Sequence, residues 1–308
     1  MTDVLINRAV EPCDGVLIVL TSSLKITLGQ TDFKDLLSKI YSQNDEEQAG
    51  AIPEIDGTRR ETFNGRDRIL ADAWDKMLET NNLGHLGIIL DGNRRWAKTN
   101  GLNPWQGYWA GANKAEEFLD WCLELGIPEV SMYVLSSENF EKRSKKELQE
   151  IFRVLLEKTQ KLINDEKIPK YEVKVKFCGS FHELPSGLVR AFQKLMRRAR
   201  NYQKMVLNVL VNYGSQGELR KAIAKAIRSA IGKKIRITPK VIQKNLMVGK
   251  PLDLIIRTGG DHRLSNFLLW QAAYAEIYFT DTLWPDFSKR EFLNIIDWFN
   301  HRQRRFGE

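Results

Sequence analysis

The sequence has few of the residues that build disulfide or zinc frameworks. Only three cysteines occur in 308 residues, Cys13, Cys122 and Cys178, and they show no metal-ligand spacing. The four histidines form no HExxH or similar pair. A sparse, odd set of cysteines is typical of reduced thiols in the cytoplasm. We therefore expect a cytoplasmic protein without a disulfide framework.

Long apolar runs are also missing. No run reaches the roughly 18 residues that a membrane-spanning helix needs. The longest candidate near the amino terminus, residues 15–20, follows Glu11 and Asp14 rather than the basic segment that opens a signal peptide. We expect a soluble protein, for which peripheral contact with a membrane stays open.

Positive charge exceeds negative charge. The chain has 47 Lys and Arg against 39 Asp and Glu, a formal net charge of +8. Such an excess favours anionic partners, which include nucleic acids, acidic lipid surfaces and phosphorylated small molecules. A solvated basic surface explains the same total, so the motifs have to decide between these alternatives.

Residues 1–80 differ in pattern from the rest of the chain. They contain a strand-like run at residues 16–20, a helical stretch near residues 33–41 and a polar segment over residues 42–67 that is typical of a loop or linker. No chemistry is evident in this region. We predict an N-terminal extension of unknown role over residues 1–80 and one larger domain over residues 81–308.

Strand and helix patterns alternate from residue 83 onward. Short apolar or alternating runs predict strands at residues 86–90, 130–135, 171–177, 206–211 and 252–256. Helical spacing predicts helices at residues 111–125, 148–155, 186–201, 216–231 and 289–304. This alternation predicts an α/β fold with a mostly parallel central sheet flanked by helices, in which the strand at 171–177 lies near an edge. Such sheets bind ligands beyond the carboxyl ends of their strands.

The first polar motif follows the predicted strand at 86–90 and reads DGNRRW over residues 91–96. Asp91 is well placed to hold Mg²⁺, which binds one or two carboxylates together with phosphate oxygens. Gly92 allows a ligand to approach the backbone closely, and Arg94 and Arg95 can bind phosphate. An ordinary turn is the alternative, because Asp-Gly-Asn is also turn chemistry.

The second polar motif follows the predicted strand at 252–256 and reads RTGGDHRLSN over residues 257–266. Arg257, Arg263 and Ser265 surround a Gly-Gly turn, a composition that suits a diphosphate because arginine forks bind two phosphate oxygens at a time. The alternative is a polar loop without a ligand. Two anion sites at neighbouring strand ends indicate two phosphorylated substrates.

Four stretches of the sequence resemble the signatures of one enzyme family. They are HLGIILDGNRRWAK at 85–98, LSSENFEKRS at 135–144, DLIIRTGGDHRLSNFLLWQAAYAEIYFTDTLWPDF at 253–287 and RRFG at 304–307. In order and spacing they are similar to the cis-prenyltransferases, the polyprenyl and undecaprenyl diphosphate synthases. Arg94 after Gly92-Asn93 resembles archaeal or eukaryotic members more than bacterial ones.

This resemblance implies a fold and a reaction. The domain at 81–308 would be a cis-prenyltransferase catalytic domain with an apolar tunnel, for which the apolar face of the helix near residues 148–155 could supply a wall or be plain core. An allylic prenyl diphosphate would lose its diphosphate, and the double bond of isopentenyl diphosphate would attack the allylic carbon. Loss of a proton would then give a new cis double bond, and repetition would give a Z-polyprenyl diphosphate.

The resemblance also implies roles for individual residues. Mg²⁺ would be held by Asp91 and Glu276. The catalytic residues would be Asp91, Ser136 and Asn139, of which Ser136 and Asn139 would lie near the reacting carbons. The allylic side would be formed by Gly92, Asn93, Arg94, Arg95, Trp96, Tyr108 and Arg143, and the isopentenyl side by Arg257, His262, Arg263 and Ser265. The terminal Arg305 and Gly307 would reach the isopentenyl site of the partner subunit in a homodimer.

Four positions depart from the pattern of the family. Gly107 is followed by Tyr108 where the family usually has histidine, and the position near Pro104 is not basic. Leu135 stands where an aromatic residue is common, and the arginine after the Asn139 motif is displaced, which leaves Lys142 and Arg143 as candidates. All four lie on the allylic side. A second hypothesis is therefore that the protein is a family member that transfers the prenyl group to a non-standard acceptor, either another allylic diphosphate or an alcohol.

Three other classes of protein fit less well. A trans-prenyltransferase would be all-helical with paired DDxxD motifs, which the chain lacks. An accessory subunit of the same family would lack the catalytic aspartate, whereas Asp91 is present. A nucleic-acid-binding module would explain the basic charge, but no platform of interleaved aromatic residues is evident. We predict no nucleic-acid partner.

Overall fold

The structure, a computed structural model, describes residues 82–233 and 236–302. The strand-like run, helical stretch and polar segment predicted within residues 1–80 lie outside these ranges, as do Arg305 and Gly307. The N-terminal extension therefore stays a prediction.

A single parallel sheet organises the described residues. Its strands are β1 (Leu86–Ile89), β2 (Glu129–Ser136), β3 (Val173–Cys178), β4 (Met205–Tyr213), β5 (Leu254–Arg257) and β6 (Glu276–Phe279). They lie in the order β3-β4-β2-β1-β5-β6, and each neighbouring pair is parallel. The predicted parallel sheet is confirmed, and so is the edge position of the strand near residues 171–177. The sequence pattern did not predict β6.

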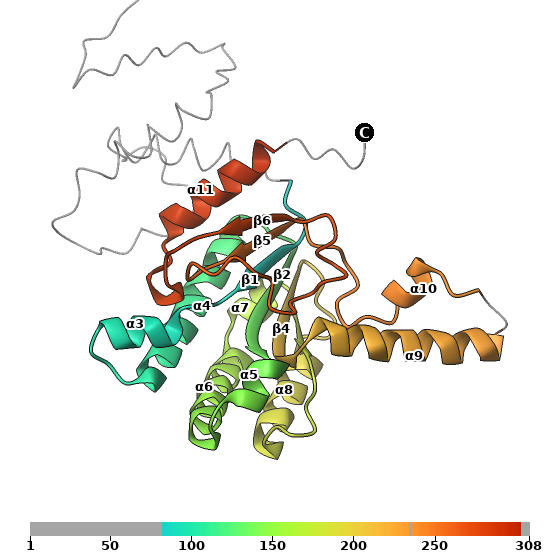
Figure 1. The fold of residues 1–308 in the computed structure, drawn as a ribbon, viewed down its shortest axis with the longest axis horizontal. Helices are drawn as coiled ribbons and strands as arrows, with labels where there is room; N and C mark the ends of the chain where they lie inside the picture. The colour runs from blue at the N-terminus through green and yellow to red at the C-terminus, as the bar shows by residue number, and fades with distance from the viewer. Residues whose placement is uncertain (1–81, 234–235, 303–308) are drawn as a thin grey trace, which may run out of the picture. The chain divides into compact units, whose positions relative to one another are not determined.

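Helices follow the strands and cover the sheet (Figure 1). They are α3 (Asn93–Thr99), α4 (Pro104–Glu124), α5 (Ser137–Lys142), α6 (Lys145–Asn164), α7 (Lys167–Lys170), α8 (Ser186–Arg198), α9 (Ser215–Lys233), α10 (Pro239–Gln243) and α11 (Lys289–Asn300), with a 3-10 turn, η1, at Trp284–Asp286. The five predicted helices are confirmed, although α4 begins earlier and α11 ends at Asn300. The short helix α3 begins inside the first polar motif, and α5 lies within the stretch at 135–144; the sequence pattern predicted neither helix.

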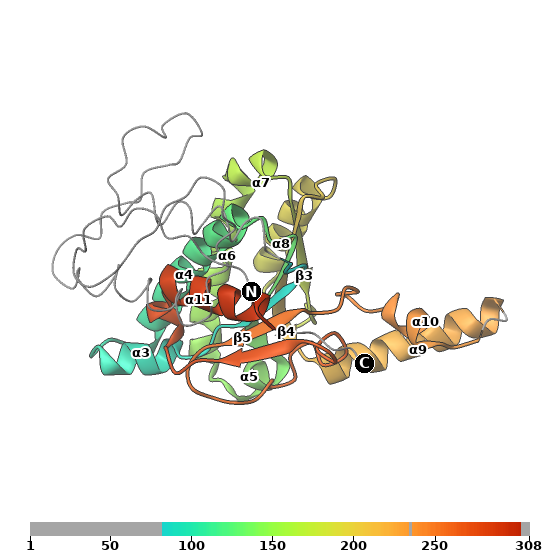
Figure 2. The same ribbon diagram turned by 90° about the horizontal axis from the view of Figure 1, so that it is seen from above.

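The two faces of the sheet have different neighbours. On β4, Leu207 and Val209 line a large cavity, whereas Leu210 belongs to a core cluster with Phe267 and Leu268. This alternation follows from the two-residue period of a strand. Helices α4 and α6 lie on the cavity side, as the turned view in Figure 2 helps to follow.

Aromatic packing fixes α4 against the carboxyl-terminal part of the chain. The ring of Phe118 on α4 lies 4.9 Å from that of Phe292 on α11 and 5.6 Å from that of Trp284 on η1. All three side chains are fully buried. This cluster holds one wall of the cavity in place. No helix within the described residues is long and apolar enough to span a membrane.

Candidate active site

The two predicted anion motifs meet because β1 and β5 are neighbours in the sheet. Ile89 lies opposite Arg257 in the strand register, so the segments that follow both strands emerge side by side. Arg257 Nη2 donates to Asp91 Oδ2 at 2.7 Å. Thr258 strengthens the junction, since its hydroxyl donates to the Asp91 carbonyl at 2.8 Å and accepts from the Asp91 amide at 3.1 Å.

The environment of Asp91 keeps its carboxyl group ionised. Burial by itself raises the pKa of Asp91, but the hydrogen bond and charge of Arg257, together with those of Arg95, outweigh burial and lower it below 3.8. Arg95 Nη2 lies 3.2 Å from Asp91 Oδ1, so each carboxylate oxygen faces an arginine. An ionised carboxylate at the end of a buried strand can hold a cation or a donor group of a substrate.

The segment after β5 wraps around the Arg257 side chain. Arg257 is only 3% exposed, and its Nη1 donates to Ser265 Oγ at 2.8 Å and to the Arg263 carbonyl. Gly259 has a φ of +89°, and a Cβ there would lie 2.7 Å from Arg95 Nη2, so glycine allows this segment to approach the first motif. Asp261 Oδ2 accepts from Arg263 Nη2 at 2.6 Å, which leaves the exposed Arg263 side chain beside the cavity.

A second polar group, beside the same cavity, joins α3, α4 and α6. The hydroxyl of Tyr108 donates to Glu147 Oε1 and accepts from Arg143 Nη1 at 2.7 Å. Arg94 Nη1 and Arg143 Nη1 each lie 3.4 Å from the same Glu147 oxygen. Of the two candidates for the displaced arginine, Arg143 is the one that contacts Tyr108, whereas Lys142 is exposed at the cavity edge.

Close packing of α3 on α4 positions the first motif. Gly92 precedes α3 with a φ of +114°. A Cβ at Gly107 would lie 2.1 Å from the Asn93 carbonyl oxygen, and one at Gly111 would lie 2.0 Å from Asn93 Oδ1. Both glycines are therefore required for the approach of Asn93 to α4. Trp284 completes this wall by donating to the Gly111 carbonyl at 2.8 Å.

Ser136 and Asn139 lie where β2 ends and α5 begins. Ser136 caps α5 by accepting from the Asn139 amide at 3.0 Å. Both residues line the cavity, near the polar segments that follow β1 and β5.

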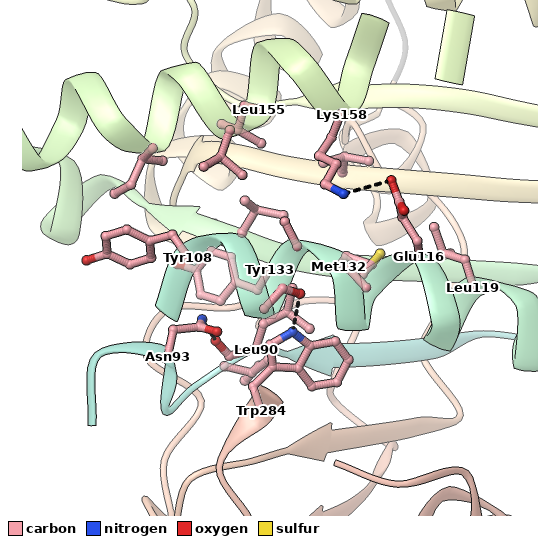
Figure 3. A pocket seen from close by; sticks show the side chains of 18 of the residues that line it. Leu90, Asn93, Tyr108, Glu116, Leu119, Met132, Tyr133, Leu155, Lys158 and Trp284 are labelled. Atoms are coloured by element: carbon pink, nitrogen blue, oxygen red, sulfur yellow. Dashed lines mark hydrogen bonds and ion pairs between the residues drawn. The ribbon is translucent and has the colours of Figure 1, made fainter. Parts of the chain in front are cut away.

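The polar groups surround one end of a cavity of about 1240 Å³. Beyond them its walls are mainly apolar, and they come from α4, α6, β2 and β4; examples are Leu119, Met132, Ile151, Leu155 and Leu207. The apolar face of α6 thus does line a cavity, through Ile151 and Leu155. Figure 3 shows Tyr108 and Asn93 at one end and Leu119 towards the other, where an ion pair of 3.1 Å between Lys158 and Glu116 links α6 to α4.

Three of the predicted site residues lie elsewhere. Trp96 donates to Asp286 Oδ1 at 2.6 Å, and His262 is exposed and stacks on Phe279 at 4.7 Å; neither lines the cavity. Glu276 opens β6 opposite Leu254, whereas Asp91 follows the other end of the parallel strands. Glu276 is paired instead with Arg302, at 3.4 Å.

Magnesium fits the oxygen donors around Asp91. The described residues hold no group of three or more His, Cys, Asp or Glu side chains that could bind a metal without a substrate. Asp91 and Asp261 do face the same Arg257 nitrogen, at 2.7 and 3.2 Å, and their side chains are 32% and 31% exposed. Because Mg²⁺ is commonly held by one or two carboxylates with substrate phosphate oxygens, this donor set suits a metal that arrives with a diphosphate.

Several contributing residues were not found from the sequence. Asp261 and Thr258 lie inside the second motif, where the arginines were the visible signal. Glu147 belongs to an ordinary helical pattern, and its contact with Tyr108 joins residues 39 positions apart. Only the spatial arrangement identifies it.

Comparison with known proteins agrees with this geometry. The profile of the family described as undecaprenyl diphosphate synthase matches residues 89–307. The chain belongs to this family. It is thus a prenyltransferase, and the predicted resemblance is confirmed.

Two curated relatives show the extent of the similarity. Each is named tritrans,polycis-undecaprenyl-diphosphate synthase (geranylgeranyl-diphosphate specific). The protein of Pyrococcus abyssi is 41% identical, over 72% of this chain and 86% of its own. That of Methanopyrus kandleri is 43% identical, over 72% of this chain and 84% of its own.

A solved structure extends the similarity to three dimensions. Lavandulyl diphosphate synthase from Lavandula x intermedia, determined in complex with dimethylallyl diphosphate, superimposes with a TM-score of 0.69 at 29% identity. The match covers 75% of this chain and all of the other. The predicted fold class is therefore confirmed.

Proposed function

We propose that this prenyltransferase condenses isopentenyl diphosphate with an allylic prenyl diphosphate to make a Z-polyprenyl diphosphate. The observation that carries the proposal is one cavity with two arginine groups at its polar end and apolar walls beyond. An allylic substrate has the matching division, a diphosphate at one end and a hydrocarbon tail at the other. A cavity of about 1240 Å³ leaves room for a tail that grows.

Each arginine group is the proposed binding site of one diphosphate. We assign the allylic diphosphate to the side of Arg94 and Arg143, and isopentenyl diphosphate to the side of Arg257, Arg263 and Ser265. The positive charges of each group would stabilise the oxygens of its diphosphate, above all as the allylic C–O bond breaks and the leaving group takes the electron pair. Ser136 and Asn139, where β2 ends and α5 begins, line the same cavity and would lie close to the reacting carbons.

Mg²⁺ is the proposed metal. Bound by Asp91, with Asp261 close by, it would neutralise charge on the leaving diphosphate. Asp91 itself orients Arg257 and Arg95, which keeps both guanidinium groups turned towards the cavity. The predicted metal role of Glu276 would need a second chain, since Glu276 opens β6 whereas Asp91 follows the other end of the parallel strands.

We further propose a homodimer. On α9, Ile223, Ile227 and Ile231 form a stripe one turn apart, with exposed fractions of 40%, 42% and 76%. A row of exposed apolar side chains is typical of an interaction surface. The tail at Arg305 and Gly307 would then reach the isopentenyl site of the partner. A cytoplasmic location, with membrane contact when a long product leaves, completes the proposal.

The test is incubation with Mg²⁺, labelled isopentenyl diphosphate and allylic primers from dimethylallyl to geranylgeranyl diphosphate, followed by chromatography. The proposal predicts labelled products that grow in five-carbon steps from one or more primers. Allylic diphosphate consumed without isopentenyl label in the product would favour the non-standard acceptor instead.

A further inference from the structure

Glu147 occupies the centre of the polar group on the allylic side. It lies in the first turn of α6, where its amide donates to the capping Ser144 hydroxyl at 3.2 Å. Its side chain, 20% exposed, accepts from Tyr108, which lines the cavity. One carboxylate oxygen thereby receives the phenol and faces the two arginines, Arg94 and Arg143.

The contacts of these arginines are incomplete. Charge-assisted hydrogen bonds are typically about 2.7–2.9 Å long. Both arginine nitrogens lie 3.4 Å from Glu147 Oε1, so they are oriented by the carboxylate without being tightly bound to it. Arg143 is 17% exposed and its Nε is buried without a hydrogen-bond partner. Two cations that line the cavity thus share one carboxylate, and part of their donor capacity is unused.

Tyr108 transmits the orientation to Arg143. Its hydroxyl lies between Glu147 and Arg143, and its ring lies 5.2 Å below the Arg143 guanidinium. Burial and the hydrogen bond to Glu147 both raise the pKa of Tyr108, so the phenol stays neutral and keeps its proton for Glu147.

We propose that Glu147 is a positioning residue that holds Arg94 and Arg143 beside the cavity and releases them to the diphosphate of the allylic substrate. A diphosphate offers more charge and more oxygens than one carboxylate, and arginine forks bind such oxygens in pairs. The exchange would make allylic binding a competition between the substrate and Glu147. This inference rests on the proposed function, since it takes the allylic diphosphate as the ligand.

Glu147→Gln tests the competition, because glutamine keeps the size of the side chain and an acceptor for Tyr108 but loses the charge. The matched control is Glu150→Gln, one turn along α6, where the carboxylate pairs at 2.6 Å with Arg153, a residue that does not line the cavity. Binding of inorganic diphosphate and of geranylgeranyl diphosphate, each without isopentenyl diphosphate, is measured by titration, and KM and kcat are measured with both substrates.

We expect Glu147→Gln to bind the allylic ligand about three- to tenfold more tightly, because Arg94 and Arg143 are then released from two partly exposed ion pairs. Its KM for isopentenyl diphosphate should match that of Glu150→Gln, while kcat falls because the arginines are less well oriented. Tyr108→Phe should weaken allylic binding, because Tyr108 links Arg143 to the Glu147 carboxylate. The loss should be smaller when Glu147→Gln is also present, since that carboxylate is then absent.

A merely structural role would lower the melting temperature and affect both substrates alike, and that result, or allylic binding equal to that of Glu150→Gln, would overturn the inference. Arg143→Ala separates this failure from failure of the proposed function. If Arg143→Ala weakens allylic binding but Glu147→Gln does not tighten it, only the competition is wrong. If Arg143→Ala leaves allylic binding unchanged, the allylic site itself has been misassigned and the inference falls with it.

Discussion

Replacing Arg257 with alanine should destabilise the protein before any substrate binds. The Arg257 side chain is 3% exposed and contacts Asp91, Asp261 and Ser265 at 2.7, 3.2 and 2.8 Å. Breaking a buried ion pair by removing one partner costs about 3–5 kcal/mol. The two carboxylates left behind are about one third exposed, so water solvates them in part, and we expect a loss of about 2 kcal/mol.

Urea denaturation and thermal melting without substrates measure this loss. For a domain of this size, about 2 kcal/mol corresponds to a fall of about 4–8 °C in Tm. Arg263→Ala is the control, because the Arg263 side chain is 63% exposed and also pairs with Asp261. It should lose less than about 1 kcal/mol. Equal losses in the two variants, or no loss in Arg257→Ala, would refute the reasoning.

The stability that Arg257→Ala loses should depend on pH. The pKa of Asp91 is lowered below 3.8 in the folded protein, so its ionised form contributes stability that is present above the unfolded pKa and is lost as pH falls through the folded pKa. Without Arg257 this contribution is reduced, because only Arg95 still lowers the pKa of Asp91. The difference in urea midpoint between the natural protein and Arg257→Ala should therefore shrink as pH is lowered from 7 to 3.

Three further predictions concern turnover. Asp91→Ala should lose some stability, because the buried Arg257 loses its nearest partner, but should remain folded and reduce kcat about a thousandfold, measured with Mg²⁺ at saturating substrates; near-normal turnover would exclude the assigned role of Asp91. Arg263→Ala should raise the KM for isopentenyl diphosphate about ten- to a hundredfold while the allylic KM changes little, and a selective allylic effect would mean that the two sites are exchanged. Removal of residues 305–308 should raise the isopentenyl KM while sedimentation still shows a dimer; an unchanged KM would indicate that the tail takes no part in the site.

The sheet and its main helices could be predicted because their signals are local. The apolar run at 86–90 and the alternating run at 171–177 have strand periodicity regardless of what surrounds them. The short elements gave no such signal. Helix α3 starts within a polar motif after a glycine at φ +114°, and β6 is a strand of only four half-buried residues, so the sheet rather than the local sequence determines it.

The site was predictable in part for the same reason. Asp91 and Arg257 were visible because each follows a recognisable strand, and parallel neighbours bring their carboxyl ends to one edge. The separation of Glu276 from Asp91 depends on the register of β6 with β5, which no local pattern encodes. Likewise Glu147 meets Arg94 across 53 residues of sequence, through the packing of α6 beside α3 and α4.

The central claim is that the apolar cavity holds the growing tail while the polar end holds both diphosphates. The length of the labelled products that Leu155→Trp makes tests this claim most directly. Leu155 lines the cavity, and Leu148→Trp on the same helix is the control because Leu148 does not line it. With labelled isopentenyl diphosphate and one primer, Leu155→Trp should make shorter products, whereas Leu148→Trp should match the natural protein. Products of unchanged length in a folded, active Leu155→Trp protein would contradict the account.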